Sequence, residues 1–393
     1  MIKSKSHWSL SKPSEILRFF IAGDVMTGRA IDQLFAIQNP EDFGKHDSVP
    51  ASQYQAWSTE LYGEVFKPVR HEYIWGSSLD VLKLAEPDFR LINLETAVTI
   101  SRGWENKKFN FRMHPANIGS LSVAEIDCCT LANNHTMDFG VRGMLDTCES
   151  LENAGIGYAG AGANLAKACE PYIRVIDGGR RILVFSWGAG DSGVPAHWQA
   201  LPDGPGLNYL PDFTSTTLSR MVDLIGSYRR PGDFVIASIH WGGNWVKSTP
   251  EPHRNLARRL IETAGVDIVH GHSSHHPLGV EVFKQKIILY GCGDLINDYE
   301  GHPDYRSMRH HLGAMYFVDF DKASGEVKNL KILPVQRRRF RLEKPSRNDS
   351  DWLMGLIRHH SKLSEGVWNR ILRSKKVNKK ADIETTMKVQ ASR

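Results

Sequence analysis

The fold of this chain is indicated most clearly by one stretch, Cys128-Cys129-Thr130-Leu131-Ala132-Asn133-Asn134-His135-Thr136-Met137-Asp138. Its apolar first part predicts the end of a buried strand, and two amides, an imidazole and a carboxylate follow directly. Asparagine has a low strand propensity and histidine is uncommon in cores. Open α/β sheets bind their ligands at the carboxyl ends of strands. The stretch therefore indicates a ligand site, with an asparagine-rich turn and a helix N-cap as the alternative.

Outward from this stretch, predicted strands alternate with predicted helices. Apolar runs predict strands at residues 16–22, 89–94, 172–176, 181–187, 233–239 and 314–320. Helical periodicity is found between them, at residues 77–85, 142–154, 213–228 and 252–264. This alternation is typical of layered α/β folds. Residues 38–70 are rich in proline, glycine and aromatic residues, and we expect an irregular insertion there.

The composition is that of an ordinary globular protein. The 393 residues are 41% hydrophobic and 24% charged, with a net charge of +5 and a pI near 8.8. This mild basic excess does not argue for nucleic-acid binding. No apolar run approaches the roughly 18 residues of a membrane span, and no signal peptide is predicted. The five cysteines form no CxxC motif, so we expect reduced, buried thiols and a cytoplasmic protein.

Polar side chains follow several other predicted strands. Asp24 ends the first strand, Asn93 and Glu95 end the strand 89–94, and His240 ends the strand 233–239. Each has an alternative when taken alone. Asp24 also fits a helix N-cap, the Asn93–Glu95 pair also fits simple hydrogen bonding of a loop, and His240 also fits a structural histidine with satisfied hydrogen bonds.

The segment Asp267–Pro277 carries four histidines within seven residues: His270, His272, His275 and His276. Four neutral imidazoles need many hydrogen-bond partners and charged ones repel one another, so this segment favours metal binding. No thiolate accompanies these groups, and mixed oxygen and imidazole ligands suit Mn, Fe or Zn. We therefore expect one or two divalent ions, and two ions about 4 Å apart would clamp a phosphoryl or acyl group.

The order of these motifs resembles that of the calcineurin-like metallophosphoesterase superfamily and, more closely, the bacterial capsule-synthesis CapA family associated with poly-γ-glutamate. The resemblance extends through Gly291-Cys292-Gly293-Asp294 and covers residues 16–365. It implies a metallophosphoesterase-like four-layer α/β/β/α sandwich of two mixed sheets flanked by helices. We expect this domain at residues 16–345, a packed C-terminal helix at 346–365 and a basic, flexible tail at 366–393.

The resemblance also implies roles for individual residues. The implied metal ligands are Asp24, Glu95 as the bridging carboxylate, Asn134, His240, and the final pair His272 and His275. His135 matches the histidine that protonates the leaving group. We expect Asp138 to orient His135, and Arg29 to neutralise an anionic group of the substrate.

Two departures from the superfamily pattern leave the number of metal ions open. Met26 stands where the Asp-x-His motif has its histidine. The usual Gly-His-x-His has an extra residue, so the ligand pair is to be chosen among His272, His275 and His276. A dinuclear centre, a mononuclear centre and a site without metal all remain open.

These observations favour a metal-dependent, phosphoesterase-type hydrolase linked by resemblance to capsule and poly-γ-glutamate synthesis. We expect a small anionic or γ-glutamyl-type substrate, no nucleic-acid partner and no membrane span. The alternative is a non-hydrolytic accessory protein in polyglutamate or peptide-polymer biosynthesis, which Met26 favours. Trp187, Trp241 and Tyr290 fit equally the wall of the cleft and the core.

Overall fold

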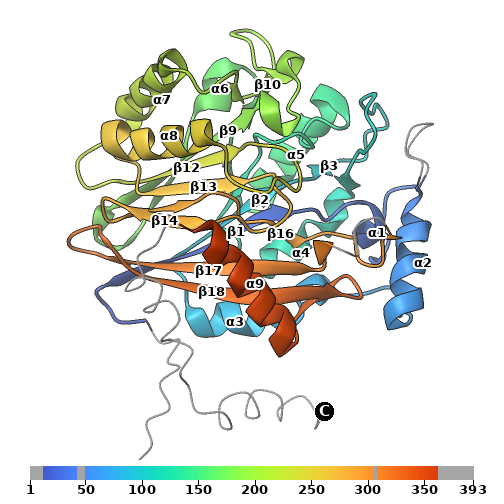
Figure 1. Cartoon of the computed structure of the whole chain (residues 1–393). Helices are drawn as coiled ribbons and strands as arrows, with labels where there is room; N and C mark the ends of the chain where they lie inside the picture. The colour runs from blue at the N-terminus through green and yellow to red at the C-terminus, as the bar shows by residue number, and fades with distance from the viewer. Residues whose placement is uncertain (1–11, 42–48, 304–307, 362–393) are drawn as a thin grey trace, which may run out of the picture.

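Two large β-sheets form the centre of the fold (Figure 1). The computed structural model describes residues 12–41, 49–303 and 308–361. Within these residues the first sheet has eight strands and the second has seven. Both sheets are mixed, because each contains parallel and antiparallel pairs. The expected α/β fold with two mixed sheets is therefore confirmed.

The first sheet is built around β1 (Ile16–Val25). Its strands in spatial order are β19 (Arg341–Glu343), β18 (Val327–Arg338), β17 (Leu312–Asp321), β1, β2 (Phe89–Leu94), β5 (Cys128–Thr130) and β6 (Gly157–Ala159), and β16 (Asp294–Ile296) pairs with the end of β1. The strands β1, β2, β5 and β6 run parallel, so their carboxyl ends lie along one edge of the sheet.

The second sheet is built around β12 (Phe234–His240). Its strands in spatial order are β11 (Tyr209–Leu210), β9 (Arg181–Ala189), β12, β13 (Ile268–His272), β15 (Lys286–Leu289) and β14 (Val280–Phe283), and β8 (Tyr172–Val175) pairs with β9. The central strands β9, β12, β13 and β15 are parallel. Two short two-stranded sheets, β3 (Ala97–Val98) with β4 (Arg112–Met113) and β7 (Ala161–Gly162) with β10 (Gly206–Leu207), lie outside both.

Three buried clusters show that the molecule has four layers. Phe19 of β1 and Phe234 of β12 belong to the cluster between the sheets, where their rings stack at 4.7 Å. The next residue of each strand, Phe20 and Val235, points to the other side of its own sheet. Because side chains alternate along a strand, each sheet has an apolar residue on both faces and needs cover on both. Helices supply the outer cover, which completes the α/β/β/α sandwich.

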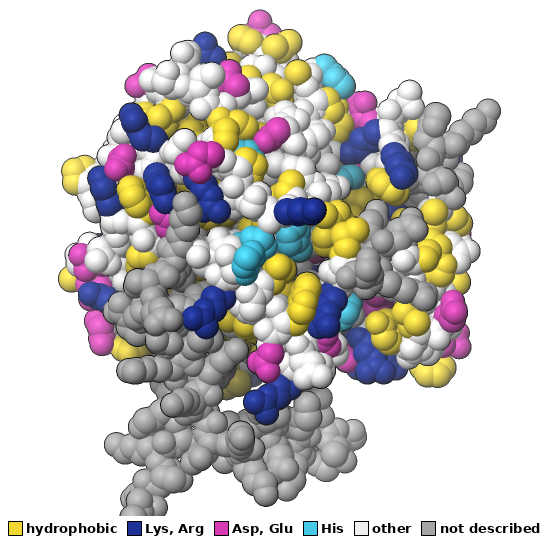
Figure 2. Space-filling model, in the orientation of Figure 1, with side chains coloured by type: hydrophobic (Ala, Val, Ile, Leu, Met, Phe, Trp, Pro, Cys, Tyr) yellow, Lys and Arg dark blue, Asp and Glu magenta, His cyan; other side chains and the backbone are white. Residues whose placement is uncertain are grey.

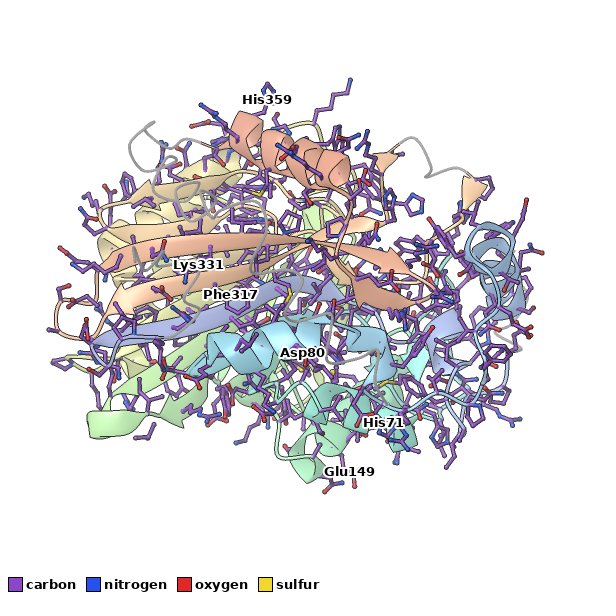
Figure 3. The ribbon with its side chains drawn as sticks, turned by 90° about the horizontal axis from the view of Figure 1, so that it is seen from below. His71, Asp80, Glu149, Phe317, Lys331 and His359 are labelled. Carbon is purple, nitrogen blue, oxygen red and sulfur yellow. The ribbon has the colours of Figure 1, made fainter. Side chains whose placement is uncertain are left out.

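The helices of the described residues are α1 (Arg29–Asp32), α2 (Ala51–Tyr62), α3 (Ser78–Ala85), α4 (Gly119–Ser122), α5 (Gly140–Asn153), α6 (Leu165–Cys169), α7 (Ser215–Tyr228), α8 (Glu251–Arg259) and α9 (Arg347–His360). Residues of α3 and α5 pack on the outer face of the first sheet, and residues of α7 and α8 pack on that of the second. Figure 3 shows α3, marked by Asp80, beneath the strands that carry Phe317 and Lys331.

The expectation of an irregular insertion at residues 38–70 was wrong over α2. This helix buries Ala51, Tyr54 and Ser58, and its other residues are exposed or half-buried. Two of its three inward residues carry hydroxyl groups, so the sequence shows little of the apolar periodicity that identifies a helix. Residues 42–48 of that segment lie outside the described residues.

The helix α9 lies on the two sheets where the expected C-terminal helix was placed (Figure 1). Leu353, Met354 and Ile357 join the cluster between the sheets. Positions 362–365 and the basic tail at 366–393 lie outside the described residues. Within the described residues, no helix has the length and apolar character needed to cross a membrane. The five cysteines are free, and four of them are buried.

Candidate metal centre

Asp24 lies at the carboxyl end of β1, where the two sheets come together. It is paired in register with Asn93 of β2 and with Asp294 of β16. Gly23 permits this arrangement, because a Cβ atom there would lie 2.1 Å from the carbonyl oxygen of Gly293. The Asn93 amide donates to Asp24 Oδ1 at 2.7 Å, and the backbone N–H of Ser273 donates to Oδ2 at 3.1 Å. Asp24 caps no helix, since α1 follows Gly28.

Asp24 belongs to two groups of side chains that could hold a metal ion. The first group contains Asp24, His240 and His272, and the second contains Asp24, Glu95, His275 and Asp294. Within each group, one ligand atom per residue lies within 4.8 Å of every other. All six side chains are buried. Asp24 is the member that both groups share, whereas Glu95, which was expected to bridge, belongs to the second group only.

The second group concentrates negative charge in the interior. Burial and the neighbouring Asp294 raise the pKa of Asp24 to about 7, and burial with Asp24 raises the pKa of Glu95 well above its usual value. His275 Nδ1 lies 2.9 Å from Asp294 Oδ1. Burial opposes its charge, but the carboxylates outweigh burial and raise the pKa of His275 to about 10. Three buried carboxylates beside one imidazole suit a divalent cation, which would displace the proton of His275 when the ring nitrogen binds it.

The first group brings two imidazole nitrogens to the same carboxylate. His240 Nδ1 lies 4.0 Å and His272 Nδ1 lies 3.7 Å from Asp24 Oδ1, and the two nitrogens are 2.7 Å apart. His240 Nε2 lies 3.0 Å from Asn134 Oδ1, which can only accept, so the His240 proton is on Nε2. Burial lowers the pKa of His240 well below its usual value. Its Nδ1 therefore presents a lone pair towards Asp24, as a metal ligand does.

The neighbouring residues Asn133 and Asn134 have different hydrogen-bond partners. Asn133 is fully buried, its amide donates to Asn93 Oδ1 and to the carbonyl of Leu94, and its oxygen accepts from the His135 N–H. Asn133 thus joins the ends of β2 and β5. It has the structural role in an asparagine-rich turn that the sequence offered as the alternative to a ligand site. Asn134 is half-buried and contacts His240. Its expected role as a metal ligand stays a prediction.

His135 lies beside the centre, with its ring held on two sides. Its Nδ1 lies 2.7 Å from Asp138 Oδ2, and its ring stacks on Phe111 at 4.0 Å. Its Nε2 lies 3.9 Å from Glu95 Oε1, on the side of the second ligand group. His135 and His275 are each 7% exposed, so this side of the centre is the one that reaches solvent.

Lys107 completes the surroundings of His135, and the sequence pattern did not single it out. Its ammonium lies 2.5 Å from Asp138 Oδ1 and 3.3 Å from His135 Nδ1, and it also donates to the Asn134 carbonyl. Burial and Lys107 lower the pKa of His135 well below its usual value. Burial raises the pKa of Asp138 to about 7, against the opposing effect of Lys107.

Arg29 lies behind the wall of the site and has partners within the protein. Its Nε donates to Asp298 Oδ2 at 2.9 Å, its Nη1 donates to the Tyr54 hydroxyl at 2.9 Å, and its Nη2 also pairs with Asp298. The guanidinium lies 4.8 Å from the centre of the Phe111 ring. Arg29 is only 1% exposed, so the geometry gives it a role in supporting the wall, and the expected contact with a substrate anion does not follow from it.

The structure also shows where the three histidines considered for the final ligand pair lie, and where Met26 lies. His272 and His275 fall in different ligand groups, and His276 belongs to neither, since its Nδ1 faces the carbonyl of Ser274. Met26 is buried next to Asp24, and its N–H donates to the carbonyl of Ile296. Asp294, the first residue of β16, takes part in the second group, a role that the sequence motifs do not predict. Its position as a polar residue shortly after a predicted strand is the sequence feature that could have identified it.

Of the two equal interpretations of three aromatic residues, as cleft wall or as core, the structure has them in the core. Trp187, Trp241 and Tyr290 are at most 3% exposed and belong to the outer cluster of the second sheet. Figure 2 shows histidine side chains near the middle of the face that carries α9, with lysine and arginine side chains around them.

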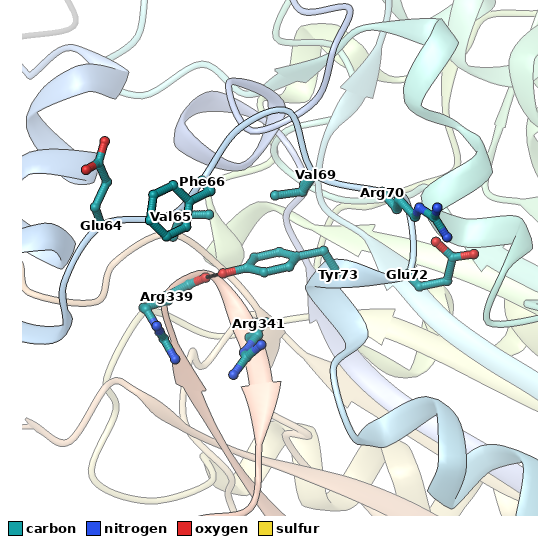
Figure 4. A pocket seen from close by; sticks show the side chains of 9 residues that line it. All are labelled: Glu64, Val65, Phe66, Val69, Arg70, Glu72, Tyr73, Arg339 and Arg341. Atoms are coloured by element: carbon teal, nitrogen blue, oxygen red, sulfur yellow. Dashed lines mark hydrogen bonds between the residues drawn. The ribbon is translucent and has the colours of Figure 1, made fainter. Parts of the chain in front are cut away.

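A separate cavity of about 700 Å³ lies at the hairpin between β18 and β19 (Figure 4). It is lined by Glu64, Val65, Phe66, Val69, Arg70, Glu72, Tyr73, Arg339 and Arg341. None of these residues belongs to either ligand group. Two arginines of this hairpin have different partners: Arg337 is buried and donates to backbone carbonyls, whereas Arg341 pairs with Glu343.

Fold and site together define an α/β/β/α protein with a candidate metal centre at the carboxyl ends of its strands. The family described as "Bacterial capsule synthesis protein PGA_cap" matches residues 18–299. The chain is 38% identical over 350 residues to a Mycobacterium tuberculosis protein named "Probable polyglutamine synthesis accessory protein", which covers 88% of this chain and 92% of that protein. The chain belongs to the bacterial capsule synthesis PGA_cap family, which confirms the CapA resemblance.

Other similar proteins match with lower identity. "Capsule biosynthesis protein CapA" of Bacillus anthracis is 28% identical over 194 residues, which are 49% of this chain and 45% of that protein. Among solved structures, "calcineurin-like phosphoesterase YfkN from Bacillus subtilis" aligns with a TM-score of 0.42 and 12% identity, over 93% of this chain and 100% of that chain.

Proposed function

We propose that this chain is a metal-dependent hydrolase of the phosphoesterase type. One observation carries the proposal: two groups of buried ligand side chains share Asp24, and the His135–Asp138 pair lies beside them. Asp24, His240 and His272 would hold one divalent ion, and Asp24, Glu95, His275 and Asp294 a second. When bound, such ions supply Lewis-acid polarisation of a phosphoryl or acyl oxygen.

The residues of the chain account for orientation and proton transfer. Asp138 accepts from His135 Nδ1, so it holds the imidazole with Nε2 towards Glu95 and the second ligand group. The neutral ring of His135 has to gain a proton on Nε2 before it can deliver one to a leaving group, and the Asp138 carboxylate stabilises the imidazolium so formed. Lys107 holds Asp138 and the Asn134 carbonyl in place, and Phe111 covers the face of the ring.

The substrate we propose is a small anionic or γ-glutamyl-type compound, with Mn, Fe or Zn as the ion. Support for the γ-glutamyl type comes from membership of the capsule synthesis family. The second candidate function is a non-hydrolytic accessory role in polyglutamate or peptide-polymer synthesis. The printed name of the Mycobacterium tuberculosis relative, an accessory protein, favours it, and so does Met26 in place of a ligand histidine.

The test compares hydrolysis with metal content in the same preparations. The chain is loaded with Mn²⁺ or Zn²⁺, assayed with p-nitrophenyl phosphate and bis-p-nitrophenyl phosphate, and analysed for metal. We expect His135→Ala to lower kcat by about 10²–10⁴-fold with unchanged metal content. His240→Ala should lower metal content as well as rate. The exposed His359→Ala is the matched control.

Two outcomes would contradict the hydrolase. Hydrolysis unchanged in both His135→Ala and His240→Ala would show that the activity lies elsewhere. Fewer than one ion per wild-type chain, together with no hydrolysis, would favour the accessory role.

A further inference from the structure

A row of buried hydrogen bonds lies directly behind the ligand His272. It connects His272 on β13 to Ser238 on β12, Ser238 to His270 on β13, and His270 to the carbonyl of Ala22 on β1. All four residues are completely buried. Ser238 is paired in register with His270, and His240 with His272. Because side chains alternate along a strand, these four point to one face of the second sheet, towards β1 of the first.

The far end of the row determines where each proton lies. His270 Nε2 is 2.9 Å from the Ala22 carbonyl oxygen, which can only accept, so the proton of His270 is on Nε2. A neutral imidazole carries one proton, and this one is on Nε2, so the Nδ1 of His270 is an acceptor. The Ser238 hydroxyl, 3.0 Å from that nitrogen, donates to it.

The proton positions at the His272 end of the row follow from those at the His270 end. Ser238 Oγ has used its proton on His270, so it accepts from His272 Nε2 at 2.9 Å. His272 therefore carries its proton on Nε2 and presents a bare Nδ1 towards Asp24, 3.7 Å away. The bare Nδ1 of His240 lies 2.7 Å from it, so the two lone pairs repel each other unless a cation lies beside them. A ligand histidine is commonly held by donating its other N–H to a carboxylate or a carbonyl. Here a serine takes that place, and a second histidine orients the serine.

We propose that Ser238 and His270 are positioning residues that hold His272 as a metal ligand through Nδ1. The proposal rests on the metal centre of the proposed function, and it does not depend on hydrolysis. Because the row ends on Ala22, two residues before Asp24, it also links the His272 strand to the Asp24 strand across the two sheets. Ser238 and His270 thereby hold two ligands of the first group, Asp24 and His272, at their present separation.

The neighbouring strand provides a matched control. Ser186 of β9 is paired in register with Ser238 and is equally buried, but its hydroxyl accepts from the backbone N–H of Ala132. Replacing either serine by alanine removes one buried hydroxyl from the same layer. Only Ser238→Ala leaves the His272 N–H without its acceptor.

The first measurement is the affinity of the full chain for Zn²⁺, by competition with a chromophoric chelator. We expect Ser238→Ala to weaken binding by about 10- to 100-fold, as loss of an outer partner of a ligand histidine does. Ser238→Thr, which keeps the hydroxyl, should stay close to wild type, and so should Ser186→Ala. If Ser238→Ala does not fold, Ser238→Cys, with its weak S–H donor, should show a smaller loss in the same direction.

The second measurement is the tautomer of His272 in the Zn²⁺-bound chain, from long-range ¹⁵N–¹H correlation spectra of protein labelled at histidine. Wild type should show the proton on Nε2, and Ser238→Ala should show a mixture of tautomers. Equal affinities of Ser238→Ala and Ser186→Ala, or a wild-type proton on Nδ1, would overturn the proposal. A wild-type chain that binds no Zn²⁺ would overturn it too, whereas Zn²⁺ binding without hydrolysis of phosphate esters contradicts only the proposed function.

Discussion

Asp24 is the residue on which both ligand groups depend. It accepts hydrogen bonds from Asn93 and Ser273, so its two oxygens are held in a fixed orientation. Its neighbours Glu95 and Asp294 are also buried carboxylates. Little water lies between them, so the repulsion between their negative charges is weakly screened. A carboxylate cluster of this kind is unfavourable unless protons or cations balance it. The buried carboxylates therefore repel one another, and a bound divalent ion would relieve this repulsion.

Glu300 is a second buried carboxylate, away from the ligand groups. Its Oε1 accepts from Ser58 of α2 at 2.5 Å and from the N–H of Phe340 at 2.7 Å. Burial raises the pKa of Glu300 to about 7, in spite of these hydrogen bonds. The folded protein thus keeps the proton at pH values where the unfolded chain, with its value of 4.5, has lost it. This contribution to stability is complete below pH 4.5 and is lost as the pH rises through about 7.

Glu300→Gln should therefore flatten the pH dependence of stability. We expect the variant to gain on wild type between pH 5 and pH 8, by at most about 3 kcal/mol in the free energy of unfolding. Urea titrations at several pH values measure the difference. The exposed Glu60→Gln on the same helix α2 is the control, and parallel curves for wild type and Glu300→Gln would refute the assignment.

At the scale of elements, α9 closes one side of the sandwich. Its buried residues Leu353, Met354 and Ile357 complete the cluster between the sheets, and it lies against β14, β17 and β18. The helix begins after Ser346, whose hydroxyl accepts from the N–H of Asp349 at 3.1 Å. One such cap satisfies a backbone donor that has no partner inside the helix.

Ser346→Ala should lower the free energy of unfolding by about 1 kcal/mol, because this donor loses its acceptor. Chemical denaturation of the metal-free chain measures the change. Ser346→Asn keeps a capping oxygen and should remain close to wild type. If the two variants were equally destabilised, the loss would reflect the size of the side chain and not the cap.

The elements differ in how well the sequence predicts them. The strand at residues 89–94 is predicted with the observed bounds, since a short and mainly apolar segment between polar residues is typical of a buried strand. The helix α2 was missed, because it contacts the molecule through few side chains and Tyr54 and Ser58 carry polar groups. Periodicity reports the burial of a helix, so a helix with little apolar burial leaves a weak pattern.

At the scale of the whole molecule, the candidate metal centre joins the two sheets. Asp24, Glu95 and Asp294 belong to the first sheet or the loops that follow its strands, and His240 and His272 belong to the second. Any ion held by both sets is bound by the folded chain only, because the unfolded chain does not bring them together. Binding is then coupled to folding.

Addition of Mn²⁺ or Zn²⁺ should consequently raise the melting temperature of the chain. At a free concentration of 100 times Kd, the expected gain in stability is about 2.7 kcal/mol. Differential scanning fluorimetry with ion and with EDTA at one scan rate measures it. Asp24→Asn should abolish the rise, whereas the exposed Glu149→Gln should keep it (Figure 3). An undiminished rise in Asp24→Asn would place the bound ion elsewhere.

The amino-acid pattern was sufficient to identify the layered α/β fold and the polar residues that follow its strands. Local apolar periodicity and the chemistry of carboxylate and imidazole groups carry that information along the chain. Contacts between distant segments required the folded molecule: His272 and His275 enter different groups, Asp294 joins Asp24, and Lys107 reaches Asp138. Strand order and the packing of one sheet on the other set these distances. Proton positions on buried histidines such as His272 likewise depend on partners from other strands, because a hydrogen bond needs both its donor and its acceptor in place.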